Sequence, residues 1–345
     1  MLLWRSIPVV AAMFGVGVAQ AQQLHVPQRY PTIQAAVDAA RSGARIVVGP
    51  GRYYENVSIT KPIALVAPAG PVLTVIDGQQ LGPVIVAVGT GSEEVRIEGF
   101  TLTNGLHTFA MGEGPGPGAG GGIYLDSVNA TVRGNVIRGN TACLGTGIST
   151  LTASVTIEYN QIIDNRQDPS CSGADGGGIM FRGDGLRASA ISSNLIAGHV
   201  IGGGGAGIDV QGGERITIEG NVIRDNESFI GGGILMSVAS GIVRANVLLR
   251  NAAVQGGGME LLPIDNSSRL SVTDNILFGN QATFAGSSIE LASVTPTGLV
   301  LTGNKVSGDS PIPLINCLLP FDVSPSNVLR NSAGPTTSGF CTSSP

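Results

Sequence analysis

The sequence predicts an all-β solenoid of about nine stacked coils, each made of three short strands, with a short helix capping its N-terminal end. The main observation is a pattern that recurs seven times: an aliphatic run, an Asn, a second aliphatic run, a polar residue five positions on, and a glycine-rich stretch. Repetition every 25 to 34 residues is typical of stacked repeats. The aliphatic runs are three to five residues long and end at Gly, Asn or Ser, which indicates strands. The first Asn of each copy is Asn135, Asn160, Asn194, Asn221, Asn246, Asn275 and Asn304.

The two polar positions of the repeat predict two ladders of stacked side chains. Asn tolerates the left-handed backbone that a tight corner requires, and its amide can bond to the coils on both sides. His199 falls at the second position, which favours a structural role over a catalytic one. The residues at that position are Asn140, Asn165, His199, Asn226, Asn251, Asn280 and Asp309.

Composition narrows the class of protein. The chain has 345 residues, of which 52 are Gly, 12% are charged and 4% are aromatic, so the core must be built from small and branched side chains. The formal net charge is -5, and the basic residues do not form runs, so the sequence lacks the footprint of a nucleic-acid-binding protein.

Both ends of the chain differ from the repeats. Arg5, an apolar run and the Ala19-Gln20-Ala21 triplet predict a signal peptide, and that run is too short to predict membrane insertion. We therefore expect a secreted, periplasmic or cell-surface protein. Helical spacing predicts a capping helix over 31–41, with Pro31 in its first turn and Gly43 at its end. The expected segments are a signal peptide (1–21), an N-terminal cap (22–45), the coils (46–316) and a loose C-terminal tail (317–345).

Four cysteines in an exported chain predict two disulfides. Cys143 and Cys171 occupy the same loop position in neighbouring repeats, and Cys317 and Cys341 both lie in the tail, so we pair them in this way. The alternatives are free buried thiols or a metal site, although the sequence has no CxxC or paired His spacing.

The segment around Gly51, Tyr53 and Glu55 carries a G-x-Y-x-E pattern that is similar to the opening of pectin methylesterases and of periplasmic β-helix proteins. Together with the repeats, the chain resembles a single-stranded, right-handed parallel β-helix of the pectin-lyase type. The resemblance implies that the protein binds or processes an acidic or neutral polysaccharide, which lies along the sheet formed by the strand after the glycine turn. The D-F-I-F-G type motif of the methylesterases and the N-T-D and R-I-K motifs of polygalacturonases are absent, so lyase, hydrolase and epimerase-like activities all stay open.

Alternation along that strand predicts which side chains point outward. We expect Glu260 and Glu290 on adjacent coils, roughly 4.8 Å apart at Cα, with Asp209 roughly 9.6 Å from Glu260. Arg182, one coil from Asp209, would pair with it or bind a sugar carboxylate. This predicts an acidic groove in which Asp209, Glu260, Glu290 and Arg182 are catalytic candidates. The expected substrate-binding residues are Tyr124, Asp126 and Gln211.

Other interpretations of the same residues stay open. Ca²⁺ is a candidate bridging ion for such a groove, its ligands being unknown, and no other cofactor is indicated. The polar column is also what a solvated solenoid face would show. The loop over 112–122 is either a lid or a plain loop. The GGGI turns at Gly176 and Gly231 are similar to repeats of chlamydial outer-membrane proteins, so a non-catalytic, adhesin-like rod is the alternative function.

Overall fold

The structure is a computed structural model that describes residues 22–89, 94–107, 119–171, 175–183, 187–212, 215–238, 240–263, 268–291 and 298–342. The expected signal peptide and most of the 112–122 loop lie outside the described residues.

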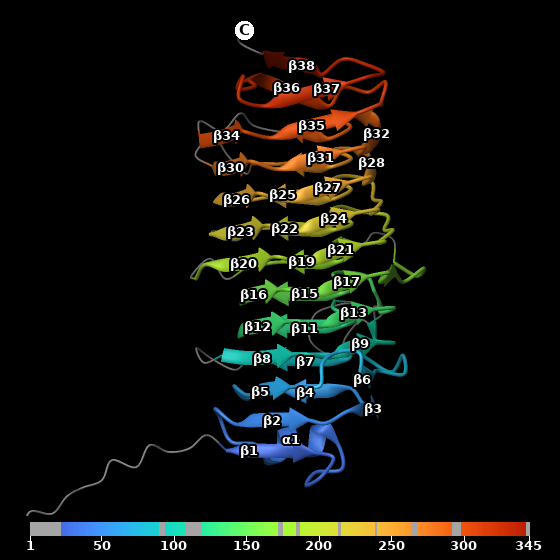
Figure 1. Cartoon of the computed structure of the whole chain (residues 1–345), viewed down its shortest axis with the longest axis vertical. Coiled ribbons are helices and arrows are strands. Elements are labelled where there is room, and N and C mark those ends of the chain that lie inside the picture. The colour runs from blue at the N-terminus through green and yellow to red at the C-terminus, as the bar shows by residue number, and fades with distance from the viewer. Residues whose placement is uncertain are drawn as a thin grey trace, which may run out of the picture.

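Three long sheets of 11 parallel strands each form a rod, and each complete coil contributes one strand to each sheet (Figure 1). We call them sheets A, B and C. Sheet A contains β1 (Gln23–Val26), β2 (Arg45–Val48), β5 (Ala64–Val66), β8 (Glu94–Glu98), β12 (Asn129–Arg133), β16 (Ser154–Glu158), β20 (Ser189–Ser192), β23 (Ile216–Glu219), β26 (Ser240–Arg244), β30 (Arg269–Thr273) and β34 (Gly298–Thr302).

Sheet B follows sheet A along each coil and contains β3 (Gly51–Tyr54), β6 (Thr74–Asp77), β9 (Thr101–Thr103), β13 (Val136–Arg138), β17 (Gln161–Ile163), β21 (Leu195–Ala197), β24 (Val222–Arg224), β27 (Val247–Leu249), β31 (Ile276–Phe278), β35 (Lys305–Gly308) and β37 (Val328–Asn331). Sheet C contains β4 (Val57–Ile59), β7 (Ile85–Val88), β11 (Ile123–Asp126), β15 (Ile148–Leu151), β19 (Ile179–Phe181), β22 (Ile208–Gln211), β25 (Ile234–Ser237), β29 (Met259–Leu261), β33 (Ile289–Leu291), β36 (Ile315–Asp322) and β38 (Thr337–Thr342). Two small sheets lie between B and C: β10 (Leu106–His107) with β14 (Thr141–Ala142) and β18 (Arg166–Gln167), and β28 (Ala252–Gln255) with β32 (Gln281–Ala285).

The all-β fold with three strands per coil is confirmed, but the expected number of coils is too low, because each long sheet has 11 strands. The missing strands lie at the two ends. β1 pairs with β2 inside the segment expected to be a cap, and β38 pairs with β36 inside the expected loose tail. The tail is therefore part of the stack.

The capping helix is shorter than the sequence predicts. It is α1 (Ile33–Ala39), and Thr32 caps it by accepting a hydrogen bond from the Ala35 amide, so Pro31 precedes the helix. The carboxylate of Glu55 accepts the amide protons of Ile33 and Gln34, both at 2.9 Å. The glutamate of the G-x-Y-x-E pattern thus holds the helix against the first coils, since these first-turn amides have no partner within the helix.

The first Asn ladder is confirmed at the corner between sheets A and B. Asn194 is representative: its side-chain amide donates to the Asn221 Oδ1 at 3.0 Å and to the Ile157 carbonyl at 2.8 Å. The left-handed residue is the one before each Asn, such as Ser193 (φ 55) and Gly220 (φ 64), not the Asn itself. Asn is therefore required for its hydrogen bonds, and a neighbour supplies the turn. The ladder continues to Asn327.

The second ladder runs through His199 and ends at Asn280, because Asp309 is exposed. Asn165 donates to His199 Nε2, so the ring must be the Nδ1–H tautomer that donates to Asn226 Oδ1 at 2.8 Å. Full burial lowers the pKa of His199 to about 4, and the ring is neutral. The structural interpretation of this histidine is supported by every contact it makes.

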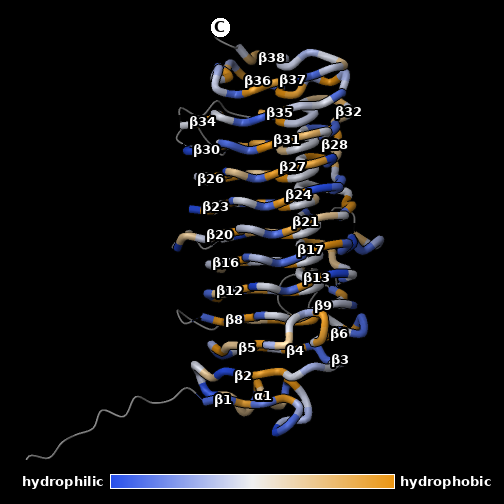
Figure 2. Tube along the Cα trace, viewed as in Figure 1, coloured by the Kyte–Doolittle hydropathy of each residue, from blue (hydrophilic) through white to orange (hydrophobic). Residues whose placement is uncertain are grey.

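The core is the space enclosed by the three sheets, and Figure 2 shows hydrophobic and hydrophilic positions alternating along the coils. The first residue of each of seven successive sheet C strands points into this core and is fully buried: Ile123, Ile148, Ile179, Ile208, Ile234, Met259 and Ile289.

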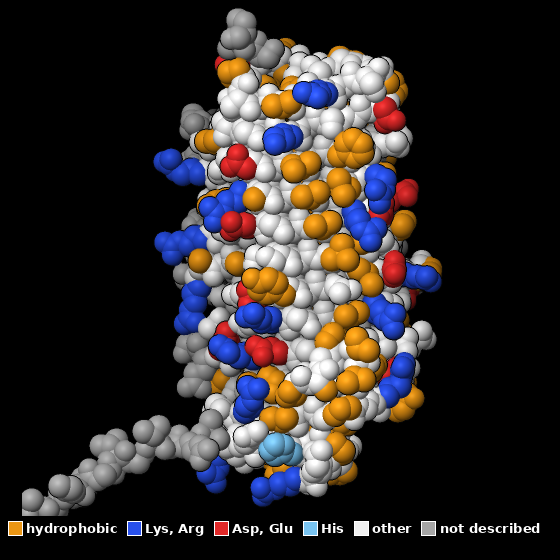
Figure 3. Space-filling view, in the orientation of Figure 1, with side chains coloured by type: hydrophobic (Ala, Val, Ile, Leu, Met, Phe, Trp, Pro, Cys, Tyr) orange, Lys and Arg blue, Asp and Glu red, His pale blue; other side chains and the backbone are white. Residues whose placement is uncertain are grey.

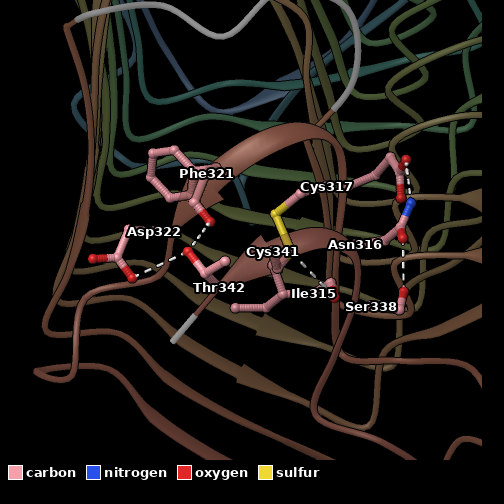
Figure 4. The surroundings of a disulfide bond; sticks show 9 residues. Ile315, Asn316, Cys317, Phe321, Asp322, Ser338, Cys341 and Thr342 are labelled. Atoms are coloured by element: carbon pink, nitrogen blue, oxygen red, sulfur yellow. Dashed lines mark hydrogen bonds between the residues drawn. A yellow bond between two sulfur atoms is a disulfide. The ribbon is translucent and has the colours of Figure 1, made fainter. Parts of the chain in front are cut away.

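Both expected disulfides are present, Cys143–Cys171 and Cys317–Cys341. The second joins β36 to β38 at the C-terminal end of the rod (Figure 4). Among the described residues, no helix is long and apolar enough to cross a bilayer.

Candidate functional site on sheet C

The outward column of sheet C has the register that the sequence predicts. Met180 pairs with Asp209, Asp209 with Leu235, Leu235 with Glu260, and Glu260 with Glu290. Asp209 and Glu260 therefore lie on the same face, two coils apart, and Leu235 separates them. The two glutamates are direct neighbours.

The expectation that these carboxylates line an open groove is wrong. Asp209, Glu260 and Glu290 are only 0%, 4% and 0% exposed. The cause is the glycine turn that precedes each strand, because it folds back over the first outward side chain. A Cβ on Gly205 would lie 2.7 Å from the Cβ of Asp209, and a Cβ on Gly286 would lie 2.7 Å from the Glu290 Oε2. The first outward column is thus a buried layer outside the sheet.

Burial changes the charge states of this layer. Desolvation, with repulsion from Glu290, raises the pKa of Glu260 to about 7, and desolvation also raises the pKa of Glu290. Asn316 donates to Glu290 Oε1 at 2.9 Å. Asn316 also accepts a hydrogen bond from Ser338 at 2.7 Å, as Figure 4 shows. Among the described atoms, the Oε2 atoms of both glutamates have no hydrogen-bond partner. The Glu260–Glu290 pair therefore belongs to the buried layer and not to an accessible groove.

The accessible part of the face is a polar cluster centred on Arg182 and Gln211, both half-buried. Arg182 does not pair directly with Asp209: it donates to Gln211 Oε1 at 2.8 Å, and Gln211 donates to Asp209 Oδ2 at 2.8 Å. Gln211 also donates to Asp175 at 3.4 Å. Burial, together with the charge of Asp175, raises the pKa of Asp209 well above its usual range. A protonated Asp209 carries its proton on Oδ1, since Oδ2 accepts from Gln211.

Tyr124 and Asp126 extend the cluster toward the N-terminal end. The Tyr124 hydroxyl donates to Asp126 Oδ2 at 3.4 Å, and its ring packs edge-on against His107, with centroids 6.3 Å apart. Burial and the charge of Asp126 raise the pKa of Tyr124 to about 12, an effect that Arg182 partly offsets. The phenol is therefore protonated at neutral pH, whereas Asp126 is half-buried and accessible.

Two members of the cluster are absent from the expected site, Asp175 and His107. Asp175 precedes a glycine turn, in a column otherwise formed by Ala119, Leu144, Gly204, Ile230 and Gln255. Asp175 is acidic whereas the other residues of this column are uncharged, and this difference is visible in the sequence. The Nδ1 atom of His107 makes a hydrogen bond with the Ala119 carbonyl, which lies on the other side of the long loop in the sequence. No local pattern in the sequence predicts this contact.

The cluster offers five chemical groups. They are the guanidinium of Arg182, the accessible carboxylate of Asp126, the side-chain amide of Gln211, and two groups that carry a proton when neutral, Asp209 and Tyr124. Among the described residues, no group of three His, Cys, Asp or Glu side chains is placed to hold a metal ion.

A comparison with protein families matches residues 171–319 to the family described as "Right handed beta helix region". The fold is a right-handed parallel β-helix. A cell surface glycoprotein of Methanothermus fervidus is 27% identical over 134 residues, which are 38% of this chain and 19% of that protein. The chain therefore matches about a fifth of the length of this relative.

Two solved structures are similar to this chain at low identity. An alginate lyase from Paenibacillus sp. str. FPU-7 is 17% identical, with a TM-score of 0.48, over 93% of this chain and 99% of that one. PfbA, a surface adhesin of Streptococcus pneumoniae, is 14% identical, with a TM-score of 0.45, over 91% and 88% of the two chains.

Proposed function

We propose that this β-helix protein binds and processes an acidic polysaccharide that lies along the outer face of sheet C, by lyase, hydrolase or epimerase-like chemistry. The observation that carries the proposal is the accessible Arg182 guanidinium, oriented by Gln211 and joined through it to Asp209. A guanidinium that is held in place binds a sugar carboxylate with little further loss of side-chain entropy.

The residues have distinct roles in this proposal. Arg182 and Gln211 bind the sugar, and the buried Asp209 positions Gln211. Asp126, with Tyr124 beside it, is the accessible carboxylate that exchanges a proton with the substrate. Glu260 and Glu290 are buried and have no contact with the polymer. Asp126 is the residue that would hold a Ca²⁺ ion. Ca²⁺ prefers oxygen ligands, which the carboxylate of Asp126 and an acidic polymer both supply.

The cellular location belongs to the same proposal. Two disulfides are retained in oxidising compartments, which favours a secreted, periplasmic or cell-surface protein.

The test is an assay of the purified protein with uronic-acid polymers, with and without Ca²⁺, following unsaturated products and new reducing ends. We expect Arg182→Gln and Asp126→Asn each to lower turnover by roughly tenfold or more, because charge-assisted contacts to the reacting sugar are lost. Arg138→Gln, an exposed arginine on sheet B, is the matched control. Wild-type rates in both site variants would contradict the proposed site.

A second candidate function is a non-catalytic surface rod, and the burial of Asp209, Glu260 and Glu290 favours it. With these three carboxylates inside, they are not the pair of acidic side chains that flanks the polymer in glycoside hydrolysis. Absence of product in all conditions, with binding to cell walls retained, would support the rod.

A further inference from the structure

A hollow of about 640 Å³ lies at the edge of sheet B from which the chain continues toward sheet C, near the C-terminal end of the rod. Residues of four successive coils surround it, because β27, β31, β35 and β37 are neighbours in the sheet. The residues that matter for its chemistry are Arg250, Phe278, Ser307, Asp309 and Arg330.

A glycine corner contributes to the hollow. Gly279 follows β31 and lies between Arg250 and Gly308 in one column. It has a φ of +62, and a Cβ there would lie 3.7 Å from the Cγ of Arg250. The bare backbone at Gly279, beside the Arg250 side chain, leaves a depression rather than a ridge.

The hollow has charges of both signs, and one of its cations has no partner. Arg330 is exposed, and among the described residues its guanidinium makes no ion pair. Arg250 is held by Asp225, with Nε and Nη2 at 2.8 and 2.9 Å from its carboxylate oxygens. Asp309 is the exposed carboxylate of the hollow. The free guanidinium of Arg330 is therefore available for an anion.

An exposed aromatic ring completes the hollow. Phe278 is 56% exposed, and the register places Ser307 between it and Arg330, so Phe278 and Arg330 lie two coil spacings apart, about 9.6 Å. Figure 3 shows hydrophobic side chains running along the rod on the face that it presents. A flat apolar surface with a cation at this separation fits a ring that carries a negative group.

We propose that this hollow is a second binding site, for an anionic sugar residue that stacks on Phe278 while its carboxylate or sulfate pairs with Arg330. The site goes beyond the proposed function of sheet C, because it is built from other residues on another sheet. It would hold the protein on an anionic glycan whether or not sheet C performs chemistry.

The test is calorimetric titration of the whole protein with three probes: a hexagalacturonate, a sulfated maltohexaose and unmodified maltohexaose. Three hollow variants, Arg330→Gln, Phe278→Ala and Ser307→Trp, are each made in the wild-type protein and in the Arg182→Gln protein. Ser307→Trp fills the hollow and keeps both arginines. Arg244→Gln on sheet A, also an exposed arginine, is the control. Circular dichroism and thermal melting verify that each variant is folded.

We expect at least one anionic probe to bind the Arg182→Gln protein, and each of the three hollow variants to weaken that binding by tenfold or more, with Arg244→Gln unchanged. The anionic probe that binds distinguishes a carboxylate from a sulfate ligand. Unchanged affinity in the hollow variants, or no binding of either anionic probe, would overturn the proposal. A loss caused by Arg182→Gln alone would instead place all binding on sheet C.

Discussion

At the scale of single residues, the buried glutamate pair links the stability of the fold to pH. Glu260 has a pKa raised from 4.5 to about 7, so between these values the folded state binds more protons than the unfolded state. The contribution of Glu260 to stability is then fully present below pH 4.5 and is lost as pH rises through 7. Glu290 is the group that faces Glu260 in the next coil, and Asn316 donates a hydrogen bond to only one of its oxygens.

Glu260→Gln is therefore expected to stabilise the protein at pH 8, by roughly 1 to 3 kcal/mol, because no buried charge has to form. The new amide is also placed to donate to Glu290, whose Oε2 has no partner among the described atoms. Urea unfolding at pH 5 and pH 8 measures the difference. Glu227→Gln, at an exposed residue, is the control. A variant as sensitive to alkaline pH as wild type would contradict this account.

At the scale of elements, the two ladders show how one corner is repeated along the rod. Each Asn satisfies a carbonyl of one coil and bonds to the amide of another, and a left-handed neighbour makes the turn. His199 fits the second ladder only as the neutral ring, and its pKa falls from 6.5 to about 4. Its contribution to stability is present above pH 6.5 and is lost as pH falls toward 4, opposite in sign to the contribution of Glu260.

We expect His199→Asn to fold, because the neighbouring ladder positions are Asn165 and Asn226. It should lose less stability than wild type between pH 6.5 and pH 4, by roughly 1 to 3 kcal/mol, since no buried imidazole has to be protonated. Thermal unfolding across this pH range is the measurement. Parallel pH profiles for the two proteins would show that the ring is not held neutral.

At the scale of the whole molecule, the rod is a stack in which each coil contacts only its neighbours, so its ends are the least supported parts. At the N-terminal end α1 is held by Glu55, and at the C-terminal end Cys317–Cys341 joins the last two strands of sheet C. The other disulfide, Cys143–Cys171, lies between inner coils of the stack.

Replacing both Cys317 and Cys341 by Ser should lower stability by about 3 kcal/mol and expose the segment after residue 317 to proteases, because the closed loop of the unfolded chain is lost. The matched control is the double replacement of Cys143 and Cys171, whose sequence separation of 28 is close to the 24 of the tail pair. Limited proteolysis with mass spectrometry locates the cuts. Equal tail cleavage in both variants would show that the disulfide does not hold the end coil.

The sequence by itself determined the fold class, the inward columns, the Asn ladder and both disulfides. These features depend on local periodicity and on the in-register stacking of equal repeats, and both are visible in a single chain. Only the tertiary structure decided which outward residues reach solvent. The backbone that covers Asp209 and Glu290 comes from glycine turns whose path no periodicity describes. The contacts of His107, Asp175 and Glu55 join different coils or cross long loops, so they too followed from three-dimensional packing.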